Sequence, residues 1–114
     1  MKKSRKEWQK AIADLTQAIK LDSSYIDAYR MRGPLYANEK QYDKAISDMT
    51  EIVRLQPEDY SSYSQRALIY CSAGKKDLAE ADFKKAEEII AKGPNPSNRR
   101  NNEGALNLTR QLCG

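Results

Sequence analysis

The chain repeats itself at a fixed interval, and this repeat constrains the fold more than any other feature. Tyr29 matches Tyr63, and Arg32 matches Arg66, in each case 34 residues later. The other matches set aromatic against aromatic, small against small, and Asp against Asp: Trp8 with Tyr42; Ala11 with Ala45 and Ala79; Asp14 with Asp48 and Asp82; Leu15 with Met49 and Phe83; Ala18 with Ile52 and Ala86. Such a period predicts an array of similar units that bury a core between neighbours.

Each complete unit is predicted to contain two helices. Tyr29, Gly33 and Tyr36 are three to four residues apart, as on one face of a first helix, and residues 38–41 form a polar turn. A second amphipathic helix follows and ends near Pro57. Residues 22–24 and 57–59 carry the Asp and Ser side chains that cap helices, so we expect them to precede the first helices.

The pattern Y-x-x-R-G-x-x-Y…Y-x-x-A-x-x-D-M…L-x-P resembles the tetratricopeptide repeat, and the resemblance covers roughly residues 5–91. Two residues differ from the pattern. Lys76 stands where the other units have the aromatic residues Trp8 and Tyr42, and Ala91 stands where the previous unit has Pro57. The resemblance implies an all-α, right-handed helix-turn-helix solenoid of about five to six helices. We expect one domain over 1–114, made of the second helix of a partial repeat (1–22), two repeats (24–57 and 58–91), a connector (92–104) and a capping helix (105–113).

The two ends of the array are predicted to differ from its middle. In the C-terminal helix, Ala105, Leu108 and Leu112 are expected to pack against the last repeat. The N-terminal helix lacks the first helix of its unit, which leaves an apolar face for self-association, formed by Trp8, Ile12, Leu15 and Ile19. Alternatively, the missing helix lies upstream in a longer parent protein.

Catalysis is not expected, and we predict that the chain is not an enzyme and needs no cofactor or metal. The chain has no His, which is the commonest general base and metal ligand, and it has no Gly-rich phosphate loop. Its two cysteines, Cys71 and Cys113, are far apart and fit no zinc motif, so we expect reduced thiols. Arg32 and Arg66 recur with the aspartates of the repeat, which favours structural ion pairs; anion binding by Arg32 is the alternative.

Charge and hydropathy exclude two further classes of partner. The net charge is +4, but basic residues alternate with acidic ones, and short basic pairs such as Lys84-Lys85 have no aromatic residues among them, so we expect no nucleic acid. The basic start "MKKSRK" is not followed by an apolar run, and no segment is long enough to span a membrane. We therefore expect no membrane partner and favour a cytoplasmic location.

The resemblance implies that a peptide or partner helix binds in a concave groove lined by the first helices. The matching positions are Asp27, Arg30, Pro34 and Ala37 in one unit and Ser61, Ser64, Leu68 and Cys71 in the next. Arg30 is the charged anchor, because its guanidinium can make two hydrogen bonds to a carboxylate. The clamp by which some repeats of this family bind chaperone tails does not fit, since Pro34, Gln65 and Met31 occupy positions that need Asn.

We thus expect a protein-protein interaction module with a peptide or protein partner that the sequence does not identify. Self-association as a homo-dimer is the alternative function. Gly33-Pro34 provides a test of the repeat, because proline normally interrupts a helix. The repeat instead aligns Gly33 with Ala67 at a contact between helices, and predicts a kinked but continuous helix with the Arg30 carbonyl turned towards the groove.

Overall fold

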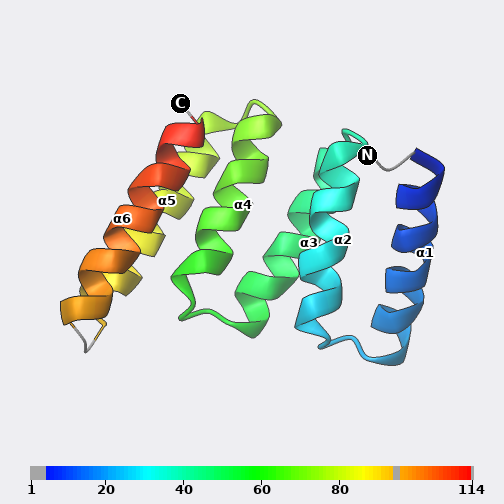
Figure 1. Cartoon of the computed structure of the whole chain (residues 1–114), viewed down its shortest axis with the longest axis horizontal. Coiled ribbons are helices and arrows are strands. Elements are labelled where there is room, and N and C mark those ends of the chain that lie inside the picture. The colour runs from blue at the N-terminus through cyan, green and yellow to red at the C-terminus, as the bar shows by residue number, and fades with distance from the viewer. Residues whose placement is uncertain (1–4, 94–95, 114) are drawn as a thin grey trace. The chain divides into compact units, whose positions relative to one another are not determined.

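The fold consists of helices joined by short turns (Figure 1). The structure is a computed structural model that describes residues 5–93 and 96–113, with the side chains of 96–99 left out. The described residues form six helices and no strand, which confirms the all-α helical-repeat class. Their bounds are α1 Arg5–Leu21, α2 Ile26–Asn38, α3 Tyr42–Leu55, α4 Tyr60–Ser72, α5 Lys76–Ala91 and α6 Pro96–Cys113.

The helices form two compact units, one ending at Leu55 and the other beginning at Gln56. In the first unit, α2 packs against both α1 and α3. In the second unit, α4, α5 and α6 all contact one another. The first five helices lie within the ranges predicted for the half repeat and the two complete repeats, whereas α6 begins at Pro96, nine residues before the predicted capping helix. The predicted connector over 92–104 is therefore wrong from Pro96 onward.

The cores of both units use equivalent positions of the repeat. Buried apolar side chains in the first unit are Ala28, Tyr29, Ala45, Met49 and Ile52. Those in the second unit are Tyr63, Ala67, Ile69, Ala79, Phe83, Ala86, Ile90 and Leu106. Gly33 lies where two helices approach closely, because a Cβ placed on it would clash with Met49 Cε. Gly33 thus occupies a helix contact, as the repeat predicts.

The helix α2 runs without interruption through Pro34, which confirms that the repeat outweighs the local effect of proline. The kink and the direction of the Arg30 carbonyl stay predictions. The predicted caps are confirmed only in part. The Asp59 side chain caps α4 by accepting a hydrogen bond from the Ser61 amide at 3.0 Å, but α2 begins after Tyr25 with no side-chain cap. Asp22 instead accepts from the Ser24 amide within the preceding turn.

The turns inside the two complete repeats share one backbone geometry. Lys40 and Gly74, at equivalent positions, both have positive φ, of 61° and 78°. In each turn two amides bond back to the end of the first helix: Lys40 to Ala37 and Gln41 to Tyr36, then Gly74 to Cys71 and Lys75 to Tyr70. This is the Schellman arrangement, which favours Gly at the left-handed position.

Candidate interaction surfaces on the first helices

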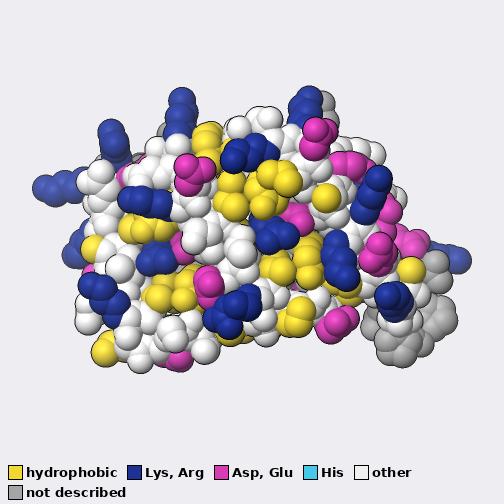
Figure 2. Space-filling view, turned by 180° about the vertical axis from the view of Figure 1, so that it is seen from behind, with side chains coloured by type: hydrophobic (Ala, Val, Ile, Leu, Met, Phe, Trp, Pro, Cys, Tyr) yellow, Lys and Arg dark blue, Asp and Glu magenta, His cyan; other side chains and the backbone are white. Residues whose placement is uncertain are grey.

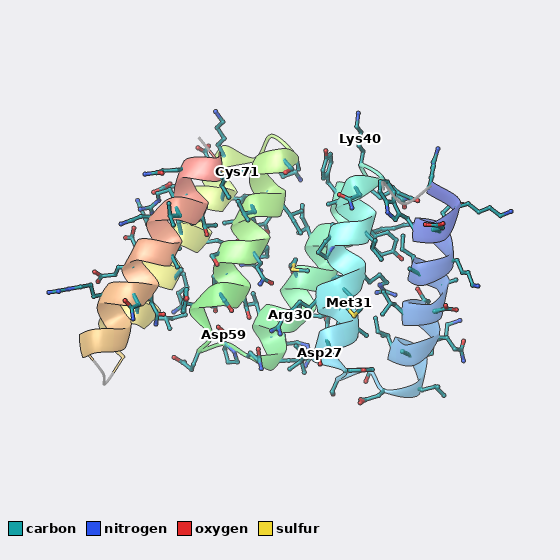
Figure 3. All side chains as sticks on the ribbon, viewed as in Figure 1. Asp27, Arg30, Met31, Lys40, Asp59 and Cys71 are labelled. Carbon is teal, nitrogen blue, oxygen red and sulfur yellow. A yellow bond between two sulfur atoms is a disulfide. The ribbon has the colours of Figure 1, made fainter. Side chains whose placement is uncertain are left out.

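The predicted groove residues of the first unit share one face of α2. Asp27, Arg30, Pro34 and Ala37 are spaced by three or four residues, so they lie one above another on the helix. Asp27 and Pro34 are exposed, whereas Arg30 and Ala37 are half-buried. Figure 3 shows Asp27 and Arg30 in the N-terminal half of α2. We call these four residues the α2 face.

Arg30 stands out on the α2 face because its guanidinium is poorly satisfied. Its Nη1 lies 3.7 Å from Asp27 Oδ1, and 40% of its side chain is exposed. Its Nε is buried and has no hydrogen-bond partner in the described part of the chain. A buried N–H without a partner is costly, and the loose pair with Asp27 leaves the exposed part of the same guanidinium able to take an incoming acceptor.

The repeat arginines are bound in a different way. Arg32 donates from Nε to Asp48 Oδ2 at 2.8 Å and from Nη2 to Asp48 Oδ1 at 2.6 Å. Arg66 makes the same two bonds to Asp82, at 2.8 and 2.7 Å. The hydrogen bonds to these aspartates raise the pKa of both arginines above their ordinary value, against the lowering effect of burial. The predicted structural ion pairs are confirmed. Each pair joins the first and second helices of its own repeat.

The predicted groove residues of the second unit have more partners of their own. The Ser61 hydroxyl donates to Asp59 Oδ1 at 2.8 Å, and the buried Ser64 hydroxyl donates to the Ser61 carbonyl at 3.0 Å. Leu68 is half-buried. Cys71 forms a disulfide with Cys113 of α6, so the expectation of reduced thiols is wrong. The disulfide links α6 to the C-terminal end of α4, where Figure 3 labels Cys71.

The residues of α6 that pack are not those predicted. Leu106 is buried, with 1% of its surface exposed, whereas Leu108 and Leu112 are 65% and 80% exposed, and Ala105 is also exposed. The helix turns a different face to the unit than its apolar residues suggest. Besides Leu106, Arg110 holds it in place by pairing with Glu87 and, at 3.0 Å, with Glu80. The Arg110 guanidinium also lies 5.2 Å from the centre of the Phe83 ring.

The face predicted for self-association lies on α1, which has no fully buried residue. Trp8, Ile12, Leu15 and Ile19 are all half-buried. The Thr16 hydroxyl accepts a hydrogen bond from Arg32 Nη1 at 3.0 Å, so the side of α1 that carries Thr16 is turned towards α2. Ile12 and Ile19, one turn away from Thr16, share that side, whereas Leu15 lies on another side with Ala11 and Ala18.

One exposed residue next to the α2 face, Met31, enters the sequence analysis only as a position that lacks the Asn of the chaperone clamp, and not as a contact residue. Met31 is 60% exposed and lies one helical turn from both Asp27 and Pro34 in the sequence of α2. Figure 3 labels Met31 on the same helix as Asp27. The spacing of four from Asp27 was the available signal. An exposed methionine beside an unsatisfied arginine offers apolar and charged contacts at the same place.

The remaining surface carries mixed charge. Figure 2 shows basic and acidic side chains interspersed across the face it presents, with small apolar patches between them. Within the described residues, no group of three or more His, Cys, Asp or Glu side chains is placed to hold a metal ion. No helix in the described part of the chain is long and apolar enough to cross a membrane.

Comparison with known proteins agrees with this architecture. A family model described as "Tetratricopeptide repeat" matches residues 26–59 and 60–92, more than half of the chain. No curated protein sequence matches the chain. Two solved structures of MamA are similar: both are 36% identical and cover 75% of this chain, with TM-scores of 0.71 and 0.69 and with 47% and 50% of their own lengths covered. The chain thus spans about half the length of the MamA structures. With two matched repeats, the chain belongs to the tetratricopeptide repeat family.

Proposed function

We propose that the chain is a non-catalytic protein-protein interaction module that binds a peptide or partner helix in a groove lined by its first helices. Membership of the family and the similarity to MamA support an interaction scaffold. The absence of His from the sequence and the pairing of the buried aspartates with arginines also argue against acid-base chemistry.

The observation that carries the proposal is the state of Arg30. Its guanidinium is half-exposed and only loosely paired, and it keeps a buried Nε without a partner in the described part of the chain. A ligand carboxylate can pair with the exposed part of this guanidinium in place of the loose contact to Asp27 and gain a charge-assisted hydrogen bond. Met31 would add apolar contact beside it, so the α2 face favours a ligand with a carboxylate next to an apolar side chain.

The predicted groove residues of α4, taken by themselves, are less available to a ligand than their sequence suggests. Ser61 and Ser64 use their hydroxyls within α4 and its cap, and Cys71 is held by its disulfide. Leu68 is left as the apolar contact from this unit. The charge selectivity of the groove is therefore proposed to reside on α2.

The test is selection of peptides from a random library on the wild-type chain, followed by affinity measurements on single variants. Arg30→Glu should weaken binding of the selected peptides at least about tenfold. The substitution replaces the cation that pairs with the ligand carboxylate by a second negative charge, which repels it. Arg54→Glu is the matched control: it makes the same charge change at an exposed arginine of α3. Unchanged binding by Arg30→Glu, or an equal loss in the control, would refute the role of Arg30.

Self-association through α1 is the second candidate, favoured by the half-buried state of Trp8 and Leu15; Ile12 and Ile19 share the side of α1 that is turned towards α2. A helix whose apolar residues are all partly exposed gains from a second cover. Light scattering tests this candidate directly, because it measures the molecular mass of the chain in solution at a concentration of tens of micromolar. A monomeric mass under those conditions would rule it out.

A further inference from the structure

The helix α6 is attached to the second unit at both of its ends. The chain connects its start to α5, and the disulfide between Cys71 and Cys113 connects its last residue to the end of α4. Both cysteines are half-buried, so part of each residue is open to solvent. A reductant in solution can therefore reach the bond that joins α6 to α4.

The non-covalent contacts that hold α6 are few. Among the described side chains of α6 only Leu106 is fully buried, whereas α4 and α5 each bury five residues. Arg110 lies over the Phe83 ring and pairs with Glu80 and Glu87, but both carboxylates are about half-exposed. Ion pairs that are open to solvent stabilise a fold only slightly. Burial of one leucine is thus the main non-covalent hold on this helix.

The sequence of α6 also disfavours a helix that stands alone. Four asparagines and Gly104 lie within its 18 residues, and both residue types have low helix propensity. Helices of this length gain most of their stability from packing. The packing does not require the glycine, since a Cβ on Gly104 would meet no atom within 4 Å. The helix α6 therefore depends on its attachments to remain helical.

The helices α4 and α5 hold each other through contacts that do not involve α6. Arg66 donates two hydrogen bonds to Asp82, at 2.8 and 2.7 Å. Ala67 of α4 and Ala79 of α5 have no exposed surface. Because these contacts repeat those between α2 and α3, we expect the pair to keep its fold without α6.

We propose that the Cys71–Cys113 disulfide is a redox switch: its reduction releases α6 and uncovers the part of α4 and α5 that α6 contacts, while those two helices stay folded. Released α6 remains joined to α5 through the chain. Phe83 loses the guanidinium that lies over its ring, and Leu106, 1% exposed in the oxidised chain, enters solvent. Reduction thus changes the second unit from a covered to an open apolar surface.

The reductant is a dithiol, which supplies both electrons. Its thiolate attacks one sulfur of the disulfide, the S–S bond breaks, and the other cysteine leaves as a thiolate that takes a proton. The second thiol of the reductant then attacks the mixed disulfide, closes the reductant's own disulfide and releases the first cysteine. Two electrons and two protons pass to the protein, which ends with two thiols.

The experiment is hydrogen exchange of the full chain, oxidised and then reduced with dithiothreitol in the absence of denaturant. Alkylation of the same samples counts the free thiols. We expect the amides of α6 to exchange at least about tenfold faster in the reduced chain, and the amides of α4 and α5 to keep most of their protection. Removal of the dithiol and addition of oxidised glutathione should restore the protection of α6.

Three variants test the separate steps of this switch. Cys71→Ser/Cys113→Ser should exchange like the reduced wild type and should not respond to dithiothreitol. In the reduced chain, Gly104→Ala should slow the exchange of α6 about fivefold, because it removes the low helix propensity of glycine. Ala105→Gly, at the neighbouring exposed position, should accelerate this exchange by a similar factor.

Several results would overturn the proposal. These are two free thiols before reduction, a disulfide that resists dithiothreitol in the folded chain, or equal protection of α6 in the oxidised and reduced chains. Loss of protection in α4 and α5 together with α6 would also overturn it, because the disulfide would then support the whole unit. The measurement uses no ligand and does not involve Arg30, so its outcome is independent of the groove proposal.

Discussion

Arg32 and Asp48 are 16 residues apart and are joined by two parallel hydrogen bonds, from Nε and Nη2 to the two carboxylate oxygens. The pair connects the two helices of one repeat across a contact where Asp48 is 3% exposed. The same geometry recurs between Arg66 and Asp82. A buried carboxylate is tolerated here because the planar guanidinium matches both of its oxygens.

Removal of the arginine alone should therefore be costly. Arg32→Met leaves Asp48 buried without a partner, and we expect the free energy of unfolding to fall by about 3–5 kcal/mol, measured by urea denaturation. The double variant Arg32→Met/Asp48→Leu should lose much less, because it removes the buried charge as well. Arg54→Met, at an exposed pair, should leave stability unchanged. A single variant no less stable than the double one would contradict this account.

The ion pair was predictable because the repeat supplies several observations of one contact. Arginine and aspartate recur together at a constant interval, and such recurrence indicates a structural role. Gly33 was assigned to a helix contact on the same basis, against the local signal of Gly33-Pro34. The state of Arg30 was not predictable, since its buried Nε depends on side-chain positions that do not recur. Its equivalent in the next repeat is a serine, Ser64.

The turn between α2 and α3 should be open to stabilisation. Lys40 adopts a left-handed backbone conformation that its equivalent, Gly74, adopts without steric cost. We expect Lys40→Gly to raise the free energy of unfolding by about 0.5–1 kcal/mol, and Gly74→Ala to lower it by about 1 kcal/mol. A Cβ on Gly74 would meet no atom within 4 Å, so the second effect isolates backbone conformation. Chemical denaturation measures both; equal stability of all three chains would refute the assignment.

The disulfide should hold α6 on the second unit. Cys71 and Cys113 are 42 residues apart, and among the described side chains of α6 only Leu106 is fully buried. We expect Cys113→Ser to lower the free energy of unfolding by about 3–4 kcal/mol, the range for loss of a cross-link that closes a loop of this size. In hydrogen exchange, the amides of α6 should lose protection before those of α4 and α5.

Thiol titration of the wild-type chain, denatured without reductant, provides the control for the disulfide. It should detect no free thiol, because both cysteines are paired. Detection of two thiols would show that the bond is absent. Equal exchange protection of α6 in Cys113→Ser and wild type would instead show that Leu106 and Arg110 suffice to hold the helix.

The repeat does not predict which face of the C-terminal helix packs. It follows a connector that breaks the period, so no equivalent helix indicates which face packs. The spacing of Ala105, Leu108 and Leu112 favours one face, but the partners of the helix select another, through Leu106, Arg110 and Cys113. The Arg110 pairs and the disulfide join residues that are 23 to 42 positions apart, and each occurs once. A single sequence carries no periodic signal for them.

Two leucines on different faces of α6 should respond differently to truncation. Leu106→Ala removes a side chain that is 1% exposed and leaves a cavity, so we expect the free energy of unfolding to fall by about 2–4 kcal/mol. Leu112→Ala removes the same atoms from a side chain that is 80% exposed, so it should change the free energy of unfolding by no more than about 0.5 kcal/mol. Urea denaturation of the oxidised chain measures both variants against wild type. A larger loss for Leu112→Ala than for Leu106→Ala would mean that α6 packs through the face its apolar spacing suggests, and that the placement of Arg110 over Phe83 is wrong.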